Sequence, residues 1–381
     1  MNIGVLGCGR QGSVIAQDLA KAGHWVNVFD SNPENLEQLK NLPNIKTNQF
    51  DVTDRQALIK LLKKFDIVVG ALPSRLGFYA MNCAIEAGVD MVDISYLAED
   101  PFQLQSIAKR RRIKIVPDAG FAPGLSNILI GEAYQELKPI ERIRILAGGI
   151  PQNPIPPFNY RITWSLTDLI EEYLRPVRLR RNSRIVKVAA LSGVEIINLK
   201  GIGKLECFYT DGLRTLLRTC PEGKNMEEKT IRYIGHSNLF KILIDCGFFS
   251  DQPIEVAQVK IKPKEFTLAV LKPQLSQGDT RAKRSEKDIT ILMVEVLGKS
   301  GRRKYTCIEH YDEKNKITAM ARMTGYTCSI ITQCIKDYLN YGIIPPEYLG
   351  MDKKLNSFIK QGLKARGIEI KISNGIKNKQ H

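Results

Sequence analysis

The chain has 381 residues, 43% of them hydrophobic and 25% charged; this composition excludes a disordered chain and, at roughly 150 residues per domain, predicts two or three domains. No apolar run approaches the ~18 residues of a membrane span and the first residues lack the basic segment of a signal peptide, so we expect a cytoplasmic protein without a membrane partner. The formal net charge of +16 is spread over many short basic runs without interleaved aromatic residues, which favours a solvated basic surface over a nucleic-acid partner.

The first expected strand is the apolar run 2–6, followed at once by a glycine-rich turn and by a helical pattern over 13–22. The turn contains Gly7, Cys8, Gly9, Arg10, Gln11 and Gly12. A strand before this string and a helix after it are the context that a dinucleotide-binding fingerprint requires. Gly7 would allow the tight turn, Gly9 would let the backbone approach a pyrophosphate, and Gly12 would let the helix pack on the strand. The amino terminus of the helix offers free N–H groups to the phosphates.

The second expected strand, 25–29, ends in Asp30. A carboxylate at this point can accept hydrogen bonds from the adenosine ribose and would repel the 2′-phosphate of NADP. No arginine follows at Ser31 or Asn32 to offset that repulsion, so the sequence predicts NAD as the cofactor. Asp30 can also cap the helix that begins near Pro33, a role compatible with ribose binding.

Strands and helices continue to alternate up to residue 116. We expect strands over 45–50, 67–69, 89–94 and 113–116, and helices over 54–64, 77–86 and 103–111. This alternation is typical of an α/β fold with a doubly wound parallel sheet, the Rossmann architecture. Ligands bind such sheets at the carboxyl ends of the strands. That edge would bring together Asp51, Val52, Ala71, Leu72, Pro73, Asp93, Tyr96 and Asp118.

After an expected helix over 125–137, the apolar period changes to two. The segments concerned are 143–145, 205–209, 254–261, 289–297 and 305–309. They predict a second, α+β domain with a mostly antiparallel mixed sheet. We expect a rigid loop from Gly148 through Pro157, an exposed loop over 279–287, a long helix over 320–339 with an apolar stripe that ends at Leu339, and a disordered tail from Lys371 onward.

The eight cysteines and four histidines stand far apart, and no two cysteines have Cys-x-x-Cys spacing. We therefore expect no metal site. Scattered cysteines in a chain of this length are typical of reduced, mostly buried thiols.

Several motifs together resemble the saccharopine dehydrogenase-like superfamily. They are the glycine string, Pro117–Gly124, Gly148–Pro151 followed by Tyr160, Lys229–His236 and Thr318–Arg322. Within the superfamily they are most similar to the L-lysine 6-dehydrogenases and their archaeal relatives. The resemblance implies a Rossmann domain over 1–122, an α+β substrate and dimerisation domain over 123–318, a helix returning to the Rossmann domain over 319–350, and a C-terminal helix and tail over 351–381. It also implies a homodimer or a higher homo-oligomer.

The motifs leave the amino-acid substrate open. Saccharopine-forming reductases have Gly-x-Asp-Pro-Gly where this chain has Gly120–Gly124 without the aspartate, whereas Tyr209–Arg214 resembles their version more than that of the bacterial lysine 6-dehydrogenases. The resemblance implies NAD-dependent oxidation of the ε-carbon of L-lysine, with release of ammonia. The product is 2-aminoadipate 6-semialdehyde, which cyclises to piperideine-6-carboxylate. The alternative is a saccharopine dehydrogenase that acts on saccharopine.

This chemistry needs particular side chains beside the nicotinamide. The lysine ammonium has a reference pKa near 10.4 and must lose a proton before hydride can leave the neighbouring carbon, because the product would otherwise carry two adjacent positive charges. With the resemblance, Asp118 is the candidate that holds the substrate ammonium and stabilises the iminium. A cap or turn role before Gly120 is its alternative.

Each further candidate residue also has a functional and a structural interpretation. His236 is the candidate general base, since its ordinary pKa near 6.5 suits that task, or it is a satisfied core histidine. Arg214 and Arg232 are candidates for clamping the substrate carboxylate, or they form structural ion pairs. Tyr160 donates a hydrogen bond near the reacting nitrogen or simply packs, and Asp93 and Tyr96 are expected to line the cleft.

Overall fold

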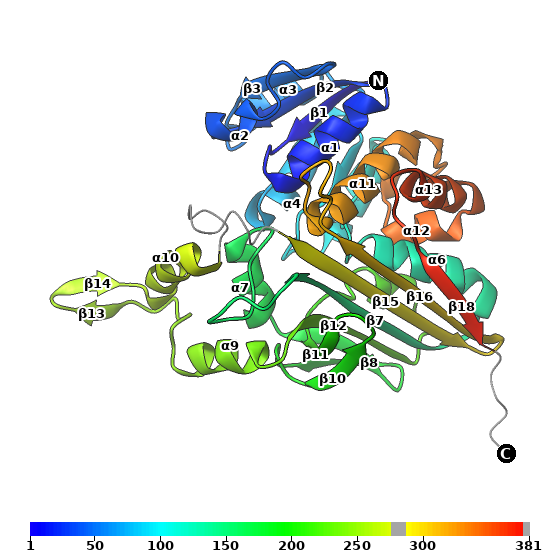
Figure 1. Ribbon diagram of the computed structural model, residues 1–381. Helices are drawn as coiled ribbons and strands as arrows, with labels where there is room; N and C mark the ends of the chain where they lie inside the picture. The colour runs from blue at the N-terminus through cyan, green and yellow to red at the C-terminus, as the bar shows by residue number, and fades with distance from the viewer. Residues whose placement is uncertain (276–286, 376–381) are drawn as a thin grey trace.

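A computed structural model describes residues 1–275 and 287–375 (Figure 1). Seven parallel strands form the sheet of the first domain, in the order β17-β6-β5-β4-β1-β2-β3. Their bounds are β1 Asn2–Leu6, β2 Trp25–Asp30, β3 Ile45–Gln49, β4 Ile67–Gly70, β5 Met91–Asp93, β6 Lys114–Val116 and β17 Gly342–Ile343. The connecting helices are α1 Arg10–Lys21, α2 Pro33–Glu37, α3 Arg55–Leu62, α4 Ser74–Ala87, η1 Pro101–Leu104 and α5 Gln105–Arg110.

Apolar residues lie on both faces of this sheet, as a parallel sheet covered by helices requires. On one face Val5 and Val69 join a core with Ile15 and Leu19 of α1. On the other face Val68 joins a second core that includes residues of α3 and α4. The short, almost continuous apolar strands of the sequence follow from this double burial.

Nine strands form the sheet of the second domain, and the main path runs β10-β11-β12-β7-β15-β16-β18, while β8 pairs with β12 and β9. The bounds are β7 Ile140–Pro151, β8 Val177–Arg181, β9 Arg184–Val188, β10 Glu195–Leu199, β11 Gly203–Tyr209, β12 Asn225–Tyr233, β15 Asp288–Gly298, β16 Gly301–His310 and β18 Lys371–Gly375. The β12–β7 pair is parallel and its neighbours are antiparallel, so the sheet is mixed. This confirms the predicted fold class.

Helices of the second half complete both domains. They are α6 Leu125–Leu137, α7 Leu166–Leu174, α8 Leu216–Thr219, α9 His236–Asp245, α10 Pro263–Leu275, α11 Ala319–Cys334, η3 Ile335–Asp337, α12 Pro346–Met351 and α13 Lys353–Ala365. Helix α11 lies beside α1 (Figure 1). Strand β17 then joins the edge of the first sheet next to β6. No helix of the described residues is long and apolar enough to cross a membrane.

The structure corrects several sequence-based expectations. Gly148–Pro151 belongs to β7 rather than to a loop, and a Cβ at Gly148 would meet the Ile231 carbonyl oxygen at 2.5 Å, so glycine lets two strands approach closely. Residues 254–261 are not one strand but the hairpin of β13 (Ile254–Val256) and β14 (Val259–Ile261). The long helix ends at Cys334, and Leu339 is 89% exposed.

The carboxyl end also differs from expectation. Lys371–Gly375 form β18, which pairs with β16, so the predicted disordered tail begins with an ordered strand. Most of the loop expected over 279–287, and residues 376–381, lie outside the described residues.

Candidate active site

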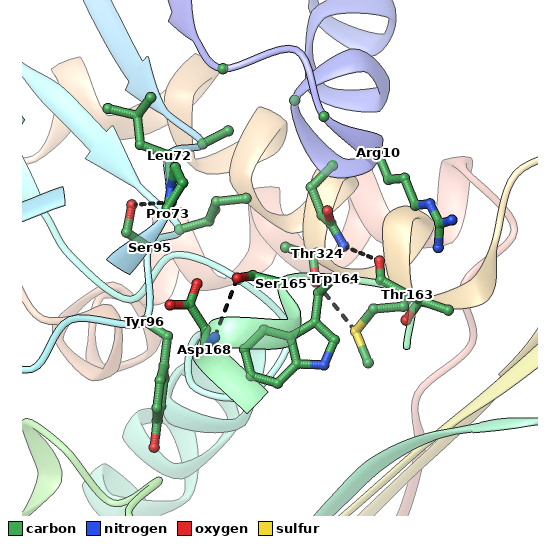
Figure 2. A pocket seen from close by; sticks show the side chains of 18 of the residues that line it. Arg10, Leu72, Pro73, Ser95, Tyr96, Thr163, Trp164, Ser165, Asp168 and Thr324 are labelled. Atoms are coloured by element: carbon green, nitrogen blue, oxygen red, sulfur yellow. Dashed lines mark hydrogen bonds between the residues drawn. The ribbon is translucent and has the colours of Figure 1, made fainter. Parts of the chain in front are cut away.

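A cavity of about 730 Å³ lies between the carboxyl edge of the first sheet and the second domain. Figure 2 shows Leu72, Pro73 and Ser95 of the first domain on one side of the cavity, and the segment Thr163–Ser165 of the second domain opposite α1. The Arg10 guanidinium donates to the Ile162 carbonyl oxygen at 3.1 Å and the Gln11 amide donates to that of Thr163 at 3.1 Å. The second domain therefore closes directly over the glycine-rich turn.

The glycine-rich turn has the geometry that a dinucleotide needs. Gly7 has a φ of +96°, and a Cβ at Gly12 would lie 2.0 Å from the Gly7 carbonyl oxygen, so α1 can pack this closely on β1 only with glycine. A Cβ at Gly9 would meet nothing within 4 Å, which leaves room for a phosphate. No side chain caps α1, and its first N–H groups remain available to an anion.

Asp30 lies at the end of β2 and lines the cavity. Its carboxylate accepts hydrogen bonds from the Cys8 N–H at 2.7 Å and the Asn32 N–H at 2.8 Å, whereas Asn32 is the residue that caps α2. Asp30 is thus held beside the glycine turn and is not itself the helix cap. The turn, the uncapped helix and this carboxylate fit a nicotinamide adenine dinucleotide.

Almost all predicted cofactor-binding residues line this cavity. They are Gly7, Gly9, Arg10, Gln11, Gly12, Asp30, Ser31, Asp51, Val52, Ala71, Leu72 and Pro73. Asp93 does not: its carboxylate is fully buried and accepts hydrogen bonds from the backbone N–H and the hydroxyl of Ser95, at 2.8 and 3.2 Å. Burial raises the pKa of Asp93 to about 7. The expectation that Asp93 lines the cleft is therefore wrong, and Asp93 instead holds the turn after β5.

Asp118 forms a buried ion pair with Arg214. The two oxygens of its carboxylate face Nε and Nη2 of Arg214 at 3.3 Å each, and both side chains are almost completely buried. Asp118 lines both the main cavity and a smaller cavity of about 300 Å³, whereas Arg214 lines only the smaller one. The Asp118 carboxylate that faces the main cavity is therefore already paired with the Arg214 cation. Arg214 forms a structural ion pair and does not clamp the substrate carboxylate.

Arg232, Tyr160 and Tyr96 do line the main cavity. The Arg232 guanidinium stacks on the Tyr160 ring at 4.5 Å, and its Nε donates to the Tyr173 hydroxyl at 3.1 Å. The Tyr96 hydroxyl donates to the Asp211 carbonyl oxygen at 3.2 Å. Arg232 thus remains a candidate for holding a carboxylate of the substrate.

His236 lies outside this cavity, contrary to expectation. Its side chain is fully buried, with Nε2 2.9 Å from the Tyr173 hydroxyl and Nδ1 2.9 Å from the Phe158 carbonyl oxygen. Burial and the nearby Arg232 lower the pKa of His236 to about 3. A histidine with both ring nitrogens engaged does not serve as the general base; it positions Tyr173, and through it Arg232.

The structure also brings three unpredicted carboxyl groups to the cavity wall: Asp168 and Glu172 on α7, and Glu228 on β12. Asp168 accepts a hydrogen bond from the Ser74 hydroxyl at 2.5 Å, which links the second domain to the start of α4. Glu228 directly precedes the Lys229–His236 motif in the sequence. Its place beside this motif is the one feature of the sequence that could have predicted a site role for Glu228.

Comparisons with known proteins agree with this two-domain site. Residues 3–116 match the family model "Saccharopine dehydrogenase NADP binding domain", and residues 120–368 match "Saccharopine dehydrogenase C-terminal domain". This chain belongs to the saccharopine dehydrogenase family. The family model and several relatives are named for NADP, whereas the sequence predicts NAD.

Individual relatives are distant. The chain is 22% identical to a saccharopine dehydrogenase [NADP(+), L-glutamate-forming] of Schizosaccharomyces pombe, over 87% of this chain and 89% of the relative. It is 24% identical to an alpha-aminoadipic semialdehyde synthase of Arabidopsis thaliana over 64% of this chain, a match that spans about a quarter (24%) of that longer protein.

A solved structure supports the fold. The apo saccharopine dehydrogenase (L-Glu forming) of Saccharomyces cerevisiae superposes on this chain with a TM-score of 0.77 at 20% sequence identity. The superposition covers 98% of this chain and 99% of the yeast chain. Both domains of this family member therefore have the architecture of that enzyme.

Proposed function

We propose that the protein is a nicotinamide-dependent oxidoreductase that breaks the carbon–nitrogen bond at the ε-nitrogen of a lysine-derived amino acid, with saccharopine as the first candidate substrate. One observation carries the proposal: both halves of the chain match saccharopine dehydrogenase domains, and they close around one cavity of about 730 Å³. Saccharopine and water would give glutamate and 2-aminoadipate 6-semialdehyde. The homo-oligomer implied by the motifs stays a prediction.

The residues of the cavity suit each requirement of this reaction. When bound, the nicotinamide accepts the hydride. Arg232 presents a guanidinium to a substrate carboxylate. The carboxyl group of Glu172 is placed to take a proton from the substrate nitrogen, and Glu228 lies on the same cavity wall. Segment 162–165, which contacts α1, limits the access of water to the reacting carbon.

L-Lysine is the second candidate, and the charges of the cavity favour it. Among the described residues that the second domain contributes to the cavity wall, Arg232 is the one cationic side chain, beside Asp168, Glu172 and Glu228. Both amino acids carry two ammonium groups, but saccharopine carries three carboxylates and is a net anion, whereas lysine carries one carboxylate and is a net cation. A wall with more acids than bases matches the charges of lysine better.

A substrate panel tests the proposal. The purified protein is mixed with NAD or NADP and either saccharopine or L-lysine at alkaline pH, and NADH or NADPH is followed by absorbance while glutamate and ammonia are assayed. Glutamate from saccharopine supports the first candidate, and ammonia from lysine supports the second. If neither amino acid reduces either nucleotide, the proposed function is wrong.

Asp30→Ala is expected to weaken NAD binding about 10- to 100-fold and to relax discrimination against NADP. The reason is that hydrogen bonds to a charged carboxylate contribute about 1.5–3 kcal/mol, and the charge that repels a 2′-phosphate is lost. Dissociation constants follow from fluorescence titration with NADH and NADPH. Asp30→Asn is the matched control, since it keeps an acceptor for the Cys8 N–H. An unchanged NADH/NADPH ratio in both variants would count against a ribose role.

A further inference from the structure

Four side chains on the second-domain wall of the cavity form one hydrogen-bonded series, which we call the Glu172–Glu228 chain. The Thr230 hydroxyl donates to Glu172 Oε1 at 2.8 Å, Thr210 Oγ1 lies 2.8 Å from Thr230 Oγ1, and Thr210 Oγ1 lies 2.7 Å from Glu228 Oε2. All four residues line the cavity. Glu172 keeps partial exposure, while Thr210, Glu228 and Thr230 are buried.

The number of protons in this chain does not match two ionised carboxylates. Three oxygen–oxygen contacts each need one proton, and the two threonine hydroxyls supply two. If both carboxylates were ionised, both hydroxyls would point at them and the 2.8 Å contact between Thr210 and Thr230 would hold no proton. One carboxyl proton completes the series. With Glu228 protonated, every hydrogen bond runs from Glu228 through Thr210 and Thr230 to an ionised Glu172.

The surroundings favour this single shared proton. Burial raises the pKa of Glu228 well above its ordinary value, and the charge of Glu172 adds to that effect. Burial also raises the pKa of Glu172, while Arg232 opposes the shift. Other charged or titratable groups also interact with the two carboxyls: Arg175, Asp211, Tyr96, Tyr160, Tyr173 and Cys207. The pair therefore titrates as a unit.

We propose that the Glu172–Glu228 chain holds one proton shared by its two carboxyls, and that Glu172 accepts the proton that the substrate nitrogen must lose before its carbon is oxidised. Glu228, Thr210 and Thr230 are positioning residues that act through Glu172. When a cationic amine enters the cavity, the O–H groups of Thr210, Thr230 and Glu228 reorient so that the one negative charge lies on Glu172. This inference rests on the proposed function, because it needs an amine as substrate.

The step balances as follows. An N–H bond of the substrate ammonium breaks, its electron pair stays on nitrogen, and the proton moves to the ionised Glu172. Hydride then leaves the neighbouring carbon with two electrons for the nicotinamide, and the iminium that forms adds water, which releases one proton to solvent. Glu172 returns its proton to the nitrogen of the water adduct. The carbon–nitrogen bond then breaks, its electron pair leaves with nitrogen, and the hydroxyl group loses its proton to solvent as the aldehyde forms. The amine departs as glutamate or ammonia and takes up one proton from solvent.

The shared proton is tested without turnover. In infrared difference spectra between the wild-type protein and Glu228→Gln at neutral pH, the wild type is expected to show one additional carbonyl band of a protonated carboxyl group, while the bands of other protonated carboxyls such as Asp93 cancel. Glu171→Gln is the matched control, because Glu171 is the preceding residue of α7 but pairs with Lys264 at 2.7 Å, outside the cavity. A difference spectrum without this band, or the same band lost in Glu171→Gln, overturns the shared proton.

The acceptor role is tested by the pH profile of kcat/KM. Glu172 must be ionised to accept a proton, so the rate falls as the pH drops through its pKa. Thr210→Val removes a hydroxyl that stabilises the ionised form. The acid limb is therefore expected to move to higher pH by about one to two units. Thr210→Ser restores the hydroxyl and is expected to return the limb toward the wild-type pH, and Glu171→Gln leaves it unmoved.

The outcomes separate this inference from the proposed function. If the protein oxidises an amine but the acid limb of Thr210→Val coincides with that of the wild type, the function stands and the acceptor role of the chain is wrong. If the infrared band behaves as expected but no amine is oxidised, the shared proton stands, and both its catalytic role and the proposed function are wrong. A purely structural role of Thr210 would lower kcat or stability without moving the limb.

Discussion

Arg214→Met is expected to lower the free energy of unfolding by about 3–5 kcal/mol, the cost of removing one partner from a buried ion pair. The Asp118 carboxylate, which faces Arg214 at 3.3 Å, would remain buried without a cation, and the Leu97 carbonyl oxygen would lose one of its two donors and keep Arg175 at 3.0 Å. Methionine keeps much of the apolar volume, so packing contributes little to the loss. Urea denaturation of both proteins measures the difference.

Two companion variants isolate the ion pair. Arg218→Met removes an exposed arginine whose nearest carboxylate, on Asp100, lies 3.8 Å away, and is expected to cost no more than about 1 kcal/mol. Asp118→Asn combined with Arg214→Met is expected to recover part of the stability, because it removes the unpaired charge. A loss in Arg214→Met no larger than that in Arg218→Met would contradict the prediction.

Arg232→Met is expected to lower kcat/KM for saccharopine or L-lysine by about 30- to 5000-fold. Losing one partner of a buried, hydrogen-bonded charge pair costs about 2–5 kcal/mol, and each 1.36 kcal/mol is a factor of ten. Most of the loss should be in KM if the guanidinium holds the substrate carboxylate equally in the ground and transition states. Initial rates at several substrate concentrations measure both parameters.

A substrate without a carboxylate provides the control. For 1,5-diaminopentane, which keeps the amines of lysine and lacks its carboxylate, wild type and Arg232→Met are expected to have similar kcat/KM values. Arg232 also donates to the Tyr173 hydroxyl, so NADH binding and thermal stability of the variant are checked in parallel. An equal loss for lysine and for the diamine would show that Arg232 supports the fold of the site and does not bind the carboxylate.

The first domain could be predicted in detail because its signals are local. The glycine spacing, the carboxylate of Asp30 and the alternation of short apolar strands with helices each depend on residues close in sequence. Most strands lie within a few residues of their expected bounds, as for β1 Asn2–Leu6 and β3 Ile45–Gln49. In the second domain the segments expected over 143–145, 205–209, 289–297 and 305–309 lie within β7, β11, β15 and β16, whereas β8, β9, β10 and β12 were not expected.

The sequence by itself determined the dinucleotide turn and the fold class, because these depend on backbone conformations and periodicities that neighbouring residues impose. The family followed from the resemblance of several motifs to known members. Only the tertiary structure decided which charged groups meet. It paired Asp118 with Arg214, 96 positions apart, buried His236 away from the cavity, and joined Glu172 to Thr230 across 58 positions. Protonation and catalytic role depend on burial and on nearby charges, and these are set by contacts between elements distant along the chain.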